Sequence, residues 1–427
     1  MKSLLSLVTF FYSFTIGEFS HMNKYKLIGL MSIFAVLILV SCSKDNTTNP
    51  ISNNQTLEQG YNSQYIVVLS NDKATSIAGS DAINARVLSI LTDHQISTND
   101  LLFVYDAALH GFAARMSHDK AIELTKDPRI AYVEADKEIK LNEPIESYND
   151  FKTNKIQTQG QNWGVNAVGA DITVDCSGST YPTAWIIDTG IDPNWASSSV
   201  SELNIITSLS RNFTSKNRNS WADGNGHGTH VSGIIGAKNN NIGTVGVAPG
   251  AKLVAVRVLN NQGSGTTSGV IAGINHVASN ATTGDVANMS LGGGYSQSLN
   301  NAVVNATTYN GKAITFCLAA GNDGANAGSY SPASANGTYI YTIAAHSSSN
   351  TFASWSNYGQ PPVDYSAPGV GILSLVLYNS RTNTASWSGT SMATPFATGI
   401  FVANDGTINY SGTVARTSTD VYNKVHM

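Results

Sequence analysis

The chain has 427 residues, of which 42% are hydrophobic and 12% charged, so it is long enough for two domains with cores of their own. Its 24 Lys and Arg against 28 Asp and Glu give a formal net charge of −4, and the basic residues form no cluster. This charge balance excludes a basic surface that would bind the phosphates of a nucleic acid.

The amino terminus carries an export signal. Lys24 and Lys26 precede the apolar run "LIGLMSIFAVLILV" at 27–40, which is shorter than the roughly 20 residues that cross a bilayer, so it predicts the apolar region of a signal peptide at 1–41. The run ends in "LVSC", which resembles a bacterial lipobox and predicts that Cys42 is lipidated. A second apolar stretch precedes Met22, which we take as an alternative start of the chain.

The next part of the chain predicts a small domain. Residues 42–60 have no apolar periodicity and are typical of a solvated tether. Residues 61–141 then give strand, helix, two strands, helix and a last strand, "IAYVEADKEIKL" at 130–141, an order that predicts an α+β domain of the split βαβ type. Residues 142–160 are polar and irregular, which indicates a linker.

Residues 161–427 predict a second, larger domain. Short apolar strands alternate with helical patterns here, for example "TAWIID", "GTHVSGIIGA", "KLVAVRVL" and "SGVIAGINHVAS". Such alternation predicts an α/β fold, a doubly wound and mostly parallel sheet with helices on both faces. Ligands are then expected at the carboxyl ends of the strands.

Three stretches at strand ends or helix starts could carry chemistry. Asp188 ends the strand in "WIIDTGID", His227 opens a helix in "GHGTHVSG", and Ser391 begins one in "GTSMATP". Together they could form a nucleophile, a base and a residue that orients the base, with helix N–H groups near the serine for a developing oxyanion. Taken singly, the aspartate could start a turn, the serine could cap a helix, and His227 with His230 could bind zinc, although no carboxylate at helical spacing accompanies them. His230 is better explained by packing.

The order Asp, His, Ser is that of subtilisin. The stretches "DTGI", "GHGTHVSG", "SLGGGYS", "AAGN", "SPAS" and "GTSMATP", in this order between about residues 163 and 403, resemble the motif set of the subtilisin-like serine proteases, and most closely the proteinase K group. The resemblance implies an endopeptidase that needs no cofactor for catalysis and cuts protein or peptide substrates.

The resemblance also implies roles for further residues. Asn322 of "AAGN" matches the side-chain donor of the oxyanion hole. A substrate would lie as an added strand along Ser290, Leu291 and Gly292, facing Ala320 and Gly321, in a wide pocket with no charged wall and an apolar P1 preference. Thr267 stands where the proteinase K group often has an aromatic residue, which leaves an aromatic S4 preference open.

Other positions stay undecided on sequence alone. Asp364 matches a carboxylate that holds a structural calcium in some relatives, although a solvated loop aspartate explains it as well. Cys176 and Cys317 could form a disulfide or remain free. Phe396 replaces a common histidine and is interpreted as packing, and the segment after residue 405 is too short to predict how the carboxyl end closes.

The first domain fits the same family. "HGFAARMS" and "DPRIAYVEAD" resemble the inhibitor-type propeptide of these proteases, which assists folding and inhibits the catalytic domain. We therefore expect an exported zymogen that cuts itself between residues 142 and 160, so that maturation would release the enzyme from a lipid anchor on the precursor. A catalytically silent surface binding protein on the same fold is the alternative. A lipase would place its serine in GxSxG, and a metallohydrolase would be inactivated by chelators.

Overall fold

The computed structural model describes residues 57–70, 80–141, 154–155, 159–160, 162–194, 201–377 and 383–427. Residues 57–427 fall in one compact unit, and residues 1–56, which include Cys42 and the predicted signal, lie outside the described residues. None of the described helices combines the length and the apolar character that a membrane crossing requires.

The first domain has the predicted order of elements. A four-stranded antiparallel sheet, in the order β2-β3-β1-β4, carries two helices on one face. Its elements are β1 (Gln64–Leu69), α3 (Ser80–Asp93), β2 (Leu101–Tyr105), β3 (Gly111–Arg115), α4 (His118–Leu124) and β4 (Ile130–Ala135), preceded by the 3-10 turn η2 (Tyr61–Ser63). The split βαβ prediction is confirmed.

One prediction in this domain is wrong. The last strand was expected to continue to residue 141, but β4 ends at Ala135 and a separate strand β5 (Glu138–Lys140) leaves the sheet. This strand pairs antiparallel with β11 (Ser264–Thr266) of the second domain. The alternation of apolar residues could not show that β5 pairs with β11 instead of continuing β4, because β4 and β5 have the same extended backbone.

The second domain is the predicted doubly wound sheet. Its main sheet has ten strands, parallel except for the last pair: β7 (Ala184–Asp188), β8 (Asn204–Ile205), β9 (Arg211–Asn212), β10 (Lys252–Arg257), β12 (Val286–Met289), β14 (Thr315–Ala319), β16 (Ile340–His346), β17 (Val363–Pro368), β20 (Asn409–Ala415) and β21 (Val421–His426). The central strands β7, β12 and β14 are buried along their whole length, which accounts for their mainly apolar sequences.

Helices cover both faces of this sheet. One face carries α5 (Trp163–Ala167), α6 (His227–Gly236) and α9 (Thr390–Ala403), and the other carries α7 (Thr267–Asn280) and α8 (Gln297–Ala306). The smaller elements are β6 (Asn154–Lys155), β13 (Gly293–Gly294), β15 (Tyr330–Ser331), β18 (Ile372–Leu375), β19 (Asn383–Trp387), η4 (Tyr309–Gly311) and η5 (Ala327–Ser329). Residues along β7 alternate between the two cores, with Ile186 on the α6 side and Ile187 on the α7 side.

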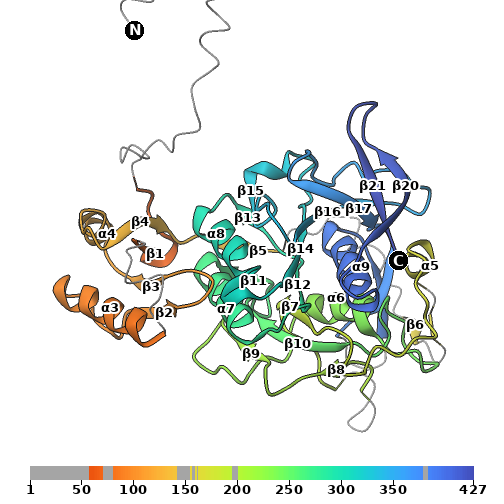
Figure 1. Cartoon of the computed structure of the whole chain (residues 1–427), viewed down its shortest axis with the longest axis horizontal. Helices are drawn as coiled ribbons and strands as arrows, with labels where there is room; N and C mark the ends of the chain where they lie inside the picture. The colour runs from red at the N-terminus through yellow and green to blue at the C-terminus, as the bar shows by residue number, and fades with distance from the viewer. Residues whose placement is uncertain are drawn as a thin grey trace, which may run out of the picture. The chain divides into compact units, whose positions relative to one another are not determined.

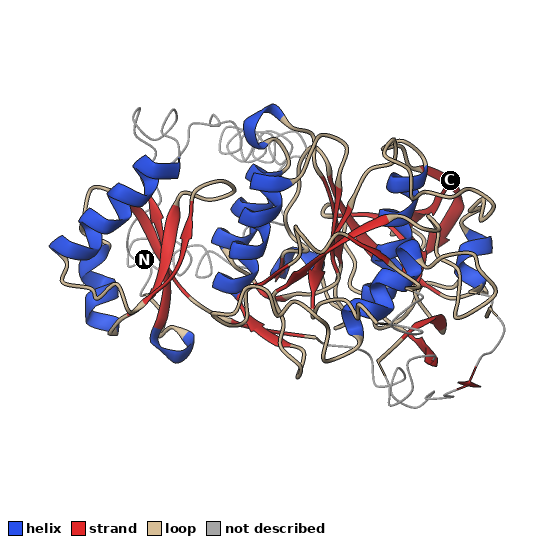
Figure 2. Ribbon diagram, turned by 90° about the horizontal axis from the view of Figure 1, so that it is seen from below, coloured by secondary structure: helices blue, strands red, loops and turns tan. Residues whose placement is uncertain are grey.

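The two domains share a hydrophobic core. Ile66 and Val68 of β1 belong to the same buried cluster as Val270 of α7 and Leu299 of α8, so α7 and α8 are sandwiched between the two sheets. Figure 1 shows this layering, from α3 and α4 through both sheets to α6 and α9, and Figure 2 shows the helices between the two groups of strands.

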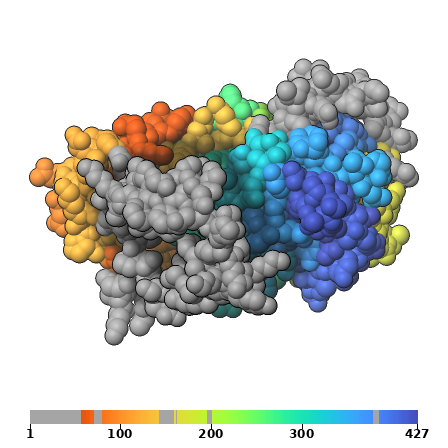
Figure 3. Space-filling model, turned by 90° about the horizontal axis from the view of Figure 1, so that it is seen from above, coloured from red at the N-terminus to blue at the C-terminus, as the bar shows by residue number. Residues whose placement is uncertain are grey.

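The carboxyl end closes as a hairpin rather than a helix. β21 extends the main sheet in parallel with β17, and β20 returns beside it as the edge strand. Tyr410 of β20 is 63% exposed. The carboxyl-terminal segment lies at the surface, in dark blue in Figure 3. The backbone N–H of Met427 donates to the carbonyl of Val168 at 2.9 Å, which ties the hairpin to the residue after α5.

Candidate active site

Asp188 and His227 are brought together at the carboxyl edge of the sheet. Asp188 is the last residue of β7, and His227 is the first residue of α6, after Gly226 in a left-handed conformation (φ +113°). Imidazole Nδ1 lies 2.8 Å from Oδ1 and 2.9 Å from Oδ2 of the buried carboxylate. Since a carboxylate can only accept, the proton sits on Nδ1 and leaves Nε2 as the basic nitrogen. Burial raises the pKa of Asp188, whereas the facing imidazole lowers it.

Ser391 lies in the first turn of α9, the helix that packs against α6. The side chain is 96% buried, with 4% exposure, and its hydroxyl donates to the carbonyl of Ser290 at 3.2 Å. Within the described residues the hydroxyl is thus hydrogen-bonded to the strand edge rather than to the imidazole. Catalytic hydrogen bonds often form only when substrate is bound, so this orientation is compatible with a later turn of the hydroxyl toward His227.

Pro395 explains part of this arrangement. A proline in a helix has no N–H for the carbonyl four residues earlier, which here is that of Ser391. The hydroxyl of Ser290 donates to that carbonyl at 2.8 Å instead. Ser290 and Ser391 therefore exchange two hydrogen bonds, each through its hydroxyl and the other's carbonyl.

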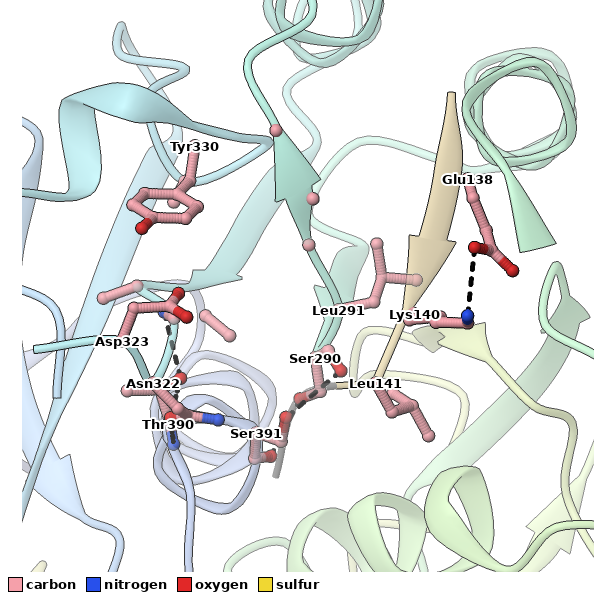
Figure 4. A pocket seen from close by; sticks show the side chains of 17 residues that line it. Glu138, Lys140, Leu141, Ser290, Leu291, Asn322, Asp323, Tyr330, Thr390 and Ser391 are labelled. Atoms are coloured by element: carbon pink, nitrogen blue, oxygen red, sulfur yellow. Dashed lines mark hydrogen bonds and ion pairs between the residues drawn. The ribbon is translucent and has the colours of Figure 1, made fainter. Parts of the chain in front are cut away.

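Asn322 is oriented by Thr390. The backbone N–H and the hydroxyl of Thr390 both donate to Oδ1 of Asn322 at 2.9 Å. The same hydroxyl accepts from the N–H of Gly321 at 3.1 Å. With its oxygen committed, the amide turns its NH₂ toward Ser391, as Figure 4 shows. This is the placement expected of an oxyanion donor.

All five predicted substrate-binding residues line one cavity of about 240 Å³, together with Asn322 and Ser391. The walls come from the segment after β12 and from the end of β14, on opposite sides of the cavity (Figure 4). The expectation of an uncharged wall is wrong, because Asp323 also lines the cavity. The "AAGN" motif ends at Asn322, and the sequence carries no signal for the direction of the Asp323 side chain, so this residue was missed.

The tail of the first domain lies along this cavity. Ile139 pairs with Gly265, and the N–H of Leu141 donates to the carbonyl of Gly263 at 3.0 Å. Lys140 and Leu141 both line the cavity. Ile139 is 1% exposed and packs so closely on Gly293 that a Cβ there would lie 2.7 Å from its Cδ1. The tail thus lies in extended form along the cavity that Ser391 also lines (Figure 4).

Two acidic residues of the first domain cap helices of the second. Asp136 accepts from the N–H and hydroxyl of Ser268 at the start of α7, at 2.9 and 2.5 Å. Glu134 does the same for Ser298 at the start of α8, at 2.8 and 2.6 Å. Negative charge at helix amino termini is stabilising, so these contacts hold the first domain on the α7 and α8 layer.

His230 is a packing residue. Its Nε2 lies 3.1 Å from the carbonyl of Ala385, and its ring stacks on Trp387 with centroids 4.5 Å apart. Burial lowers its pKa to about 3, so the ring is neutral. In the part of the chain that the structure describes, no group of three His, Cys, Asp or Glu side chains could hold a metal, which gives the zinc interpretation no support.

Two carboxylates are candidate ligands for a structural calcium ion. Asp364 accepts from the N–H of Thr342 at 2.8 Å, and burial raises its pKa to about 6. Glu202, which sequence reasoning missed, is fully buried, and its Oε1 has no hydrogen-bond partner. Burial raises the pKa of Glu202 to about 7. An orphaned buried carboxylate oxygen is a position that a cation would satisfy.

Amide groups and carbonyls of the loop at 238–244 form the hydrogen bonds of this region. The NH₂ of Asn240 donates to Oε2 of Glu202 at 3.0 Å, and the NH₂ of Gln159 donates to the carbonyls of Lys238 and Thr244 at 3.2 and 3.4 Å. The signal in the sequence was the asparagine-rich loop "KNNNIGT" at 238–244. Carboxylate, amide and carbonyl oxygens are the ligands that Ca²⁺ prefers, and a cation here would require the two amides to turn their oxygens toward it.

Cys176 and Cys317 are both buried and free, so they do not form the disulfide that the sequence left open. Phe396 is fully buried in the core beside α6, as predicted.

The family models match both domains. The model described as "Subtilase family" matches residues 184–404, and the model described as "Peptidase inhibitor I9" matches residues 64–142. The chain belongs to the subtilase family of serine proteases. Its first domain is an inhibitor-type propeptide domain, and the expected fold and family are confirmed.

Similar proteins come from bacteria and fungi. The chain is 39% identical to "Alkaline serine exoprotease A" of Vibrio alginolyticus, over 70% of this chain and 52% of that protein. It is 38% identical to "Subtilisin-like serine protease AsES" of Sarocladium strictum (73% and 74% covered) and 36% identical to "Cuticle-degrading protease" of Metarhizium anisopliae (74% and 76%). It thus spans about half the length of the first and three quarters of the others. A solved structure of a "cold adapted subtilisin-like serine proteinase" is 38% identical, covers 56% of this chain and 82% of its own, and has a TM-score of 0.48.

Proposed function

We propose that the protein is a serine endopeptidase made as a self-processing zymogen, in which Ser391 is the nucleophile, His227 the general acid and base, and Asp188 the residue that orients and charge-stabilises the imidazole. The observation that carries the proposal is the buried Asp188 and His227 pair, with Nδ1 at 2.8 and 2.9 Å from the carboxylate. Such a pair fixes the tautomer in which Nε2 can accept the serine proton.

The reaction then follows from these residues. Ser391 Oγ turns from the Ser290 carbonyl to Nε2 of His227, gives up its proton and attacks the carbonyl carbon of the scissile peptide bond. The resulting oxyanion is stabilised by the Ser391 backbone N–H and the NH₂ of Asn322. The imidazolium returns its proton to the leaving amine, and water repeats the sequence to release the acyl group.

The substrate is held as a strand beside residues 290–292, with its P1 side chain in the cavity next to Ala320 and Gly321. The tail at 138–141 supports this, because it already lies along the cavity in extended form. Small and backbone-rich walls favour a broad P1 preference that leans apolar, while Asp323 adds one charged side chain to the cavity. No cofactor takes part in the chemistry.

We further propose that residues 61–141 inhibit the catalytic domain at 161–427 until the linker at 142–160 is cut. If Cys42 carries a lipid, this cut detaches the enzyme from its anchor. Full-length Ser391→Ala should then stay in the membrane fraction, whereas the catalytic domain of the active protein should become soluble. Mature wild-type catalytic domain that remains firmly in the membrane fraction would rule out the release.

We also propose that Glu202, Asn240, Gln159 and the carbonyls of Lys238 and Thr244 hold a structural calcium ion. The unpartnered Oε1 of Glu202 supports this site over Asp364. The ion would neutralise a buried carboxylate and fix the loop at 238–244.

The proposed chemistry is tested by labelling with a fluorophosphonate. We expect the wild-type protein to be labelled at Ser391 and to accumulate as a processed form, whereas Ser391→Ala remains unlabelled and full length. A folded wild-type protein that is neither labelled nor processed would favour the silent binding protein instead.

A further inference from the structure

The loop after β2 meets α7 through its backbone. Asn275, on the face of α7 toward the first domain, accepts three successive N–H groups on one side-chain oxygen, those of Asp106, Ala107 and Ala108, at 3.2, 2.8 and 3.1 Å. Its NH₂ donates to Oδ1 of Asp106 at 2.8 Å. The other carboxylate oxygen of Asp106 accepts from the hydroxyl of Ser80, the first residue of α3.

This geometry makes the two side chains interdependent. Three successive N–H groups that converge on one point form a concavity suited to an anion, and here a neutral amide oxygen fills it. The amide can turn its oxygen toward the loop only because its NH₂ faces an acceptor, and the carboxylate of Asp106 can only accept. Each side chain thus fixes the orientation that the other needs.

Two neighbouring contacts between the domains, made by Arg218 and Tyr105, depend less on the orientation of the partner groups. Arg218 places its guanidinium 5.1 Å from the ring of Phe103 in β2 and 5.1 Å from that of Phe213 in the second domain. The hydroxyl of Tyr105 donates to the carbonyl of Ser268 at 3.0 Å. Many partner surfaces could supply a ring for the Arg218 cation or a hydroxyl for the Ser268 carbonyl. Asn275 instead requires a loop that presents N–H groups to its oxygen and an acceptor to its NH₂.

We infer that the pair Asn275 and Asp106 is a specificity determinant by which the catalytic domain retains its own propeptide domain. The partner that α7 selects is a loop with three converging N–H groups and a carboxylate beside them. The biological meaning rests on the proposed zymogen, but the binding itself requires no catalysis. A carboxylate at position 275 would suit the N–H groups and would repel Asp106, so exchanging the two residues should restore the match.

The test uses the full chain with Ser391→Ala, in which no self-cleavage can occur. A recognition sequence for a site-specific protease replaces residues 145–151, the chain is cut there, and co-elution of the two fragments on size exclusion is measured over a dilution series to obtain Kd. Asn275→Asp should raise Kd at least tenfold. The double variant Asn275→Asp with Asp106→Asn should return to within about threefold of the parent.

The control is Asn305→Asp, which adds the same charge at an exposed position of α8 and should leave Kd unchanged. Circular dichroism of the uncut proteins checks folding, and Asp106→Asn alone, which should also raise Kd, tests the pair from the other side if Asn275→Asp does not fold. An unchanged Kd in both single variants, or a double variant no tighter than Asn275→Asp, would overturn the inference. Neither result depends on peptidase activity, so failure of the proposed chemistry would be detected separately by fluorophosphonate labelling of Ser391.

Discussion

Thr390 donates two hydrogen bonds to one oxygen of Asn322, from its backbone N–H and from its hydroxyl, both at 2.9 Å. The residue before the proposed nucleophile therefore decides which end of the Asn322 amide faces the cavity. An amide that was free to flip would present its oxygen to the developing oxyanion for part of the time and would repel it.

The first prediction follows from this contact. Asn322→Ala should lower kcat about 10²- to 10³-fold, a range that comes from the corresponding donor in subtilisin itself, with KM little changed. Thr390→Val should cost about tenfold in kcat, since the backbone donor remains, and Thr390→Ser should recover most of it. Steady-state kinetics on a chromogenic peptide measure the series, and equal rates for Val and Ser at position 390 would show that the hydroxyl has no orienting role.

The second prediction concerns the buried, hydrogen-bonded pair of Asp188 and His227. Asp188→Asn should lower kcat by about 10⁴-fold because the amide favours the wrong imidazole tautomer, and full-length precursor should accumulate on gels. The matched control is Asp285→Asn, since Asp285 is also buried and accepts from Thr183 N–H and Trp185 Nε1 near the other end of β7. That variant should lose stability but keep its kcat; a comparable loss of kcat would mean that any buried carboxylate of this strand matters equally.

The third prediction concerns calcium and pH. Burial raises the pKa of Glu202 to about 7, so the folded chain holds this proton more readily than the unfolded chain, and stability falls as pH rises from about 4.5 to 7. Ca²⁺ binds the ionised carboxylate and offsets this loss. In the Ser391→Ala protein, calcium should therefore raise Tm more at pH 8 than at pH 5.5 relative to a chelator.

The variants Glu202→Gln and Asp364→Asn decide between the two candidate carboxylates. Loss of the calcium-dependent rise in Tm with Glu202→Gln, and its retention with Asp364→Asn, is the expected result. The opposite pattern would place the ion at Asp364, and loss in neither would exclude both sites.

The fourth prediction concerns the two thiols. Burial raises the pKa of Cys176 to about 11 and that of Cys317 to about 12, so neither forms a thiolate at neutral pH. Iodoacetamide should modify these two residues only after unfolding, and a reducing agent should leave Tm unchanged. Mass spectrometry of peptides from native protein checks this, and rapid native labelling of either cysteine would show that its burial is transient.

Sequence reasoning recovered the fold because its signals were local. Apolar strands alternate with helices from Ala184 to Ala403, and such alternation has few topological solutions. The motifs also put Asp188, His227 and Ser391 at element ends. What they could not give is side-chain direction, such as the turn of the Ser391 hydroxyl toward Ser290.

The missed features depend on contacts between distant segments. Glu202 looks like an ordinary surface acid until its burial beside residues 238–244 is known. The departure of β5 from its sheet depends on β11, more than 120 residues later, and Asn275 reads as a helix surface residue unless Asp106 faces it. Burial and pairing of this kind are tertiary properties that periodicity does not carry.

Because Pro395 leaves the Ser391 carbonyl to the hydroxyl of Ser290, the reactive residue and the strand edge beside the cavity are fastened to each other at two points. Under the proposed function, these hydrogen bonds couple the segment that would hold the peptide to the residue that would cut it. Substitutions at residues 290–292 that change selectivity should therefore also lower kcat. Substitutions on the opposite wall, at residues 319–321, would leave the two hydrogen bonds between Ser290 and Ser391 in place.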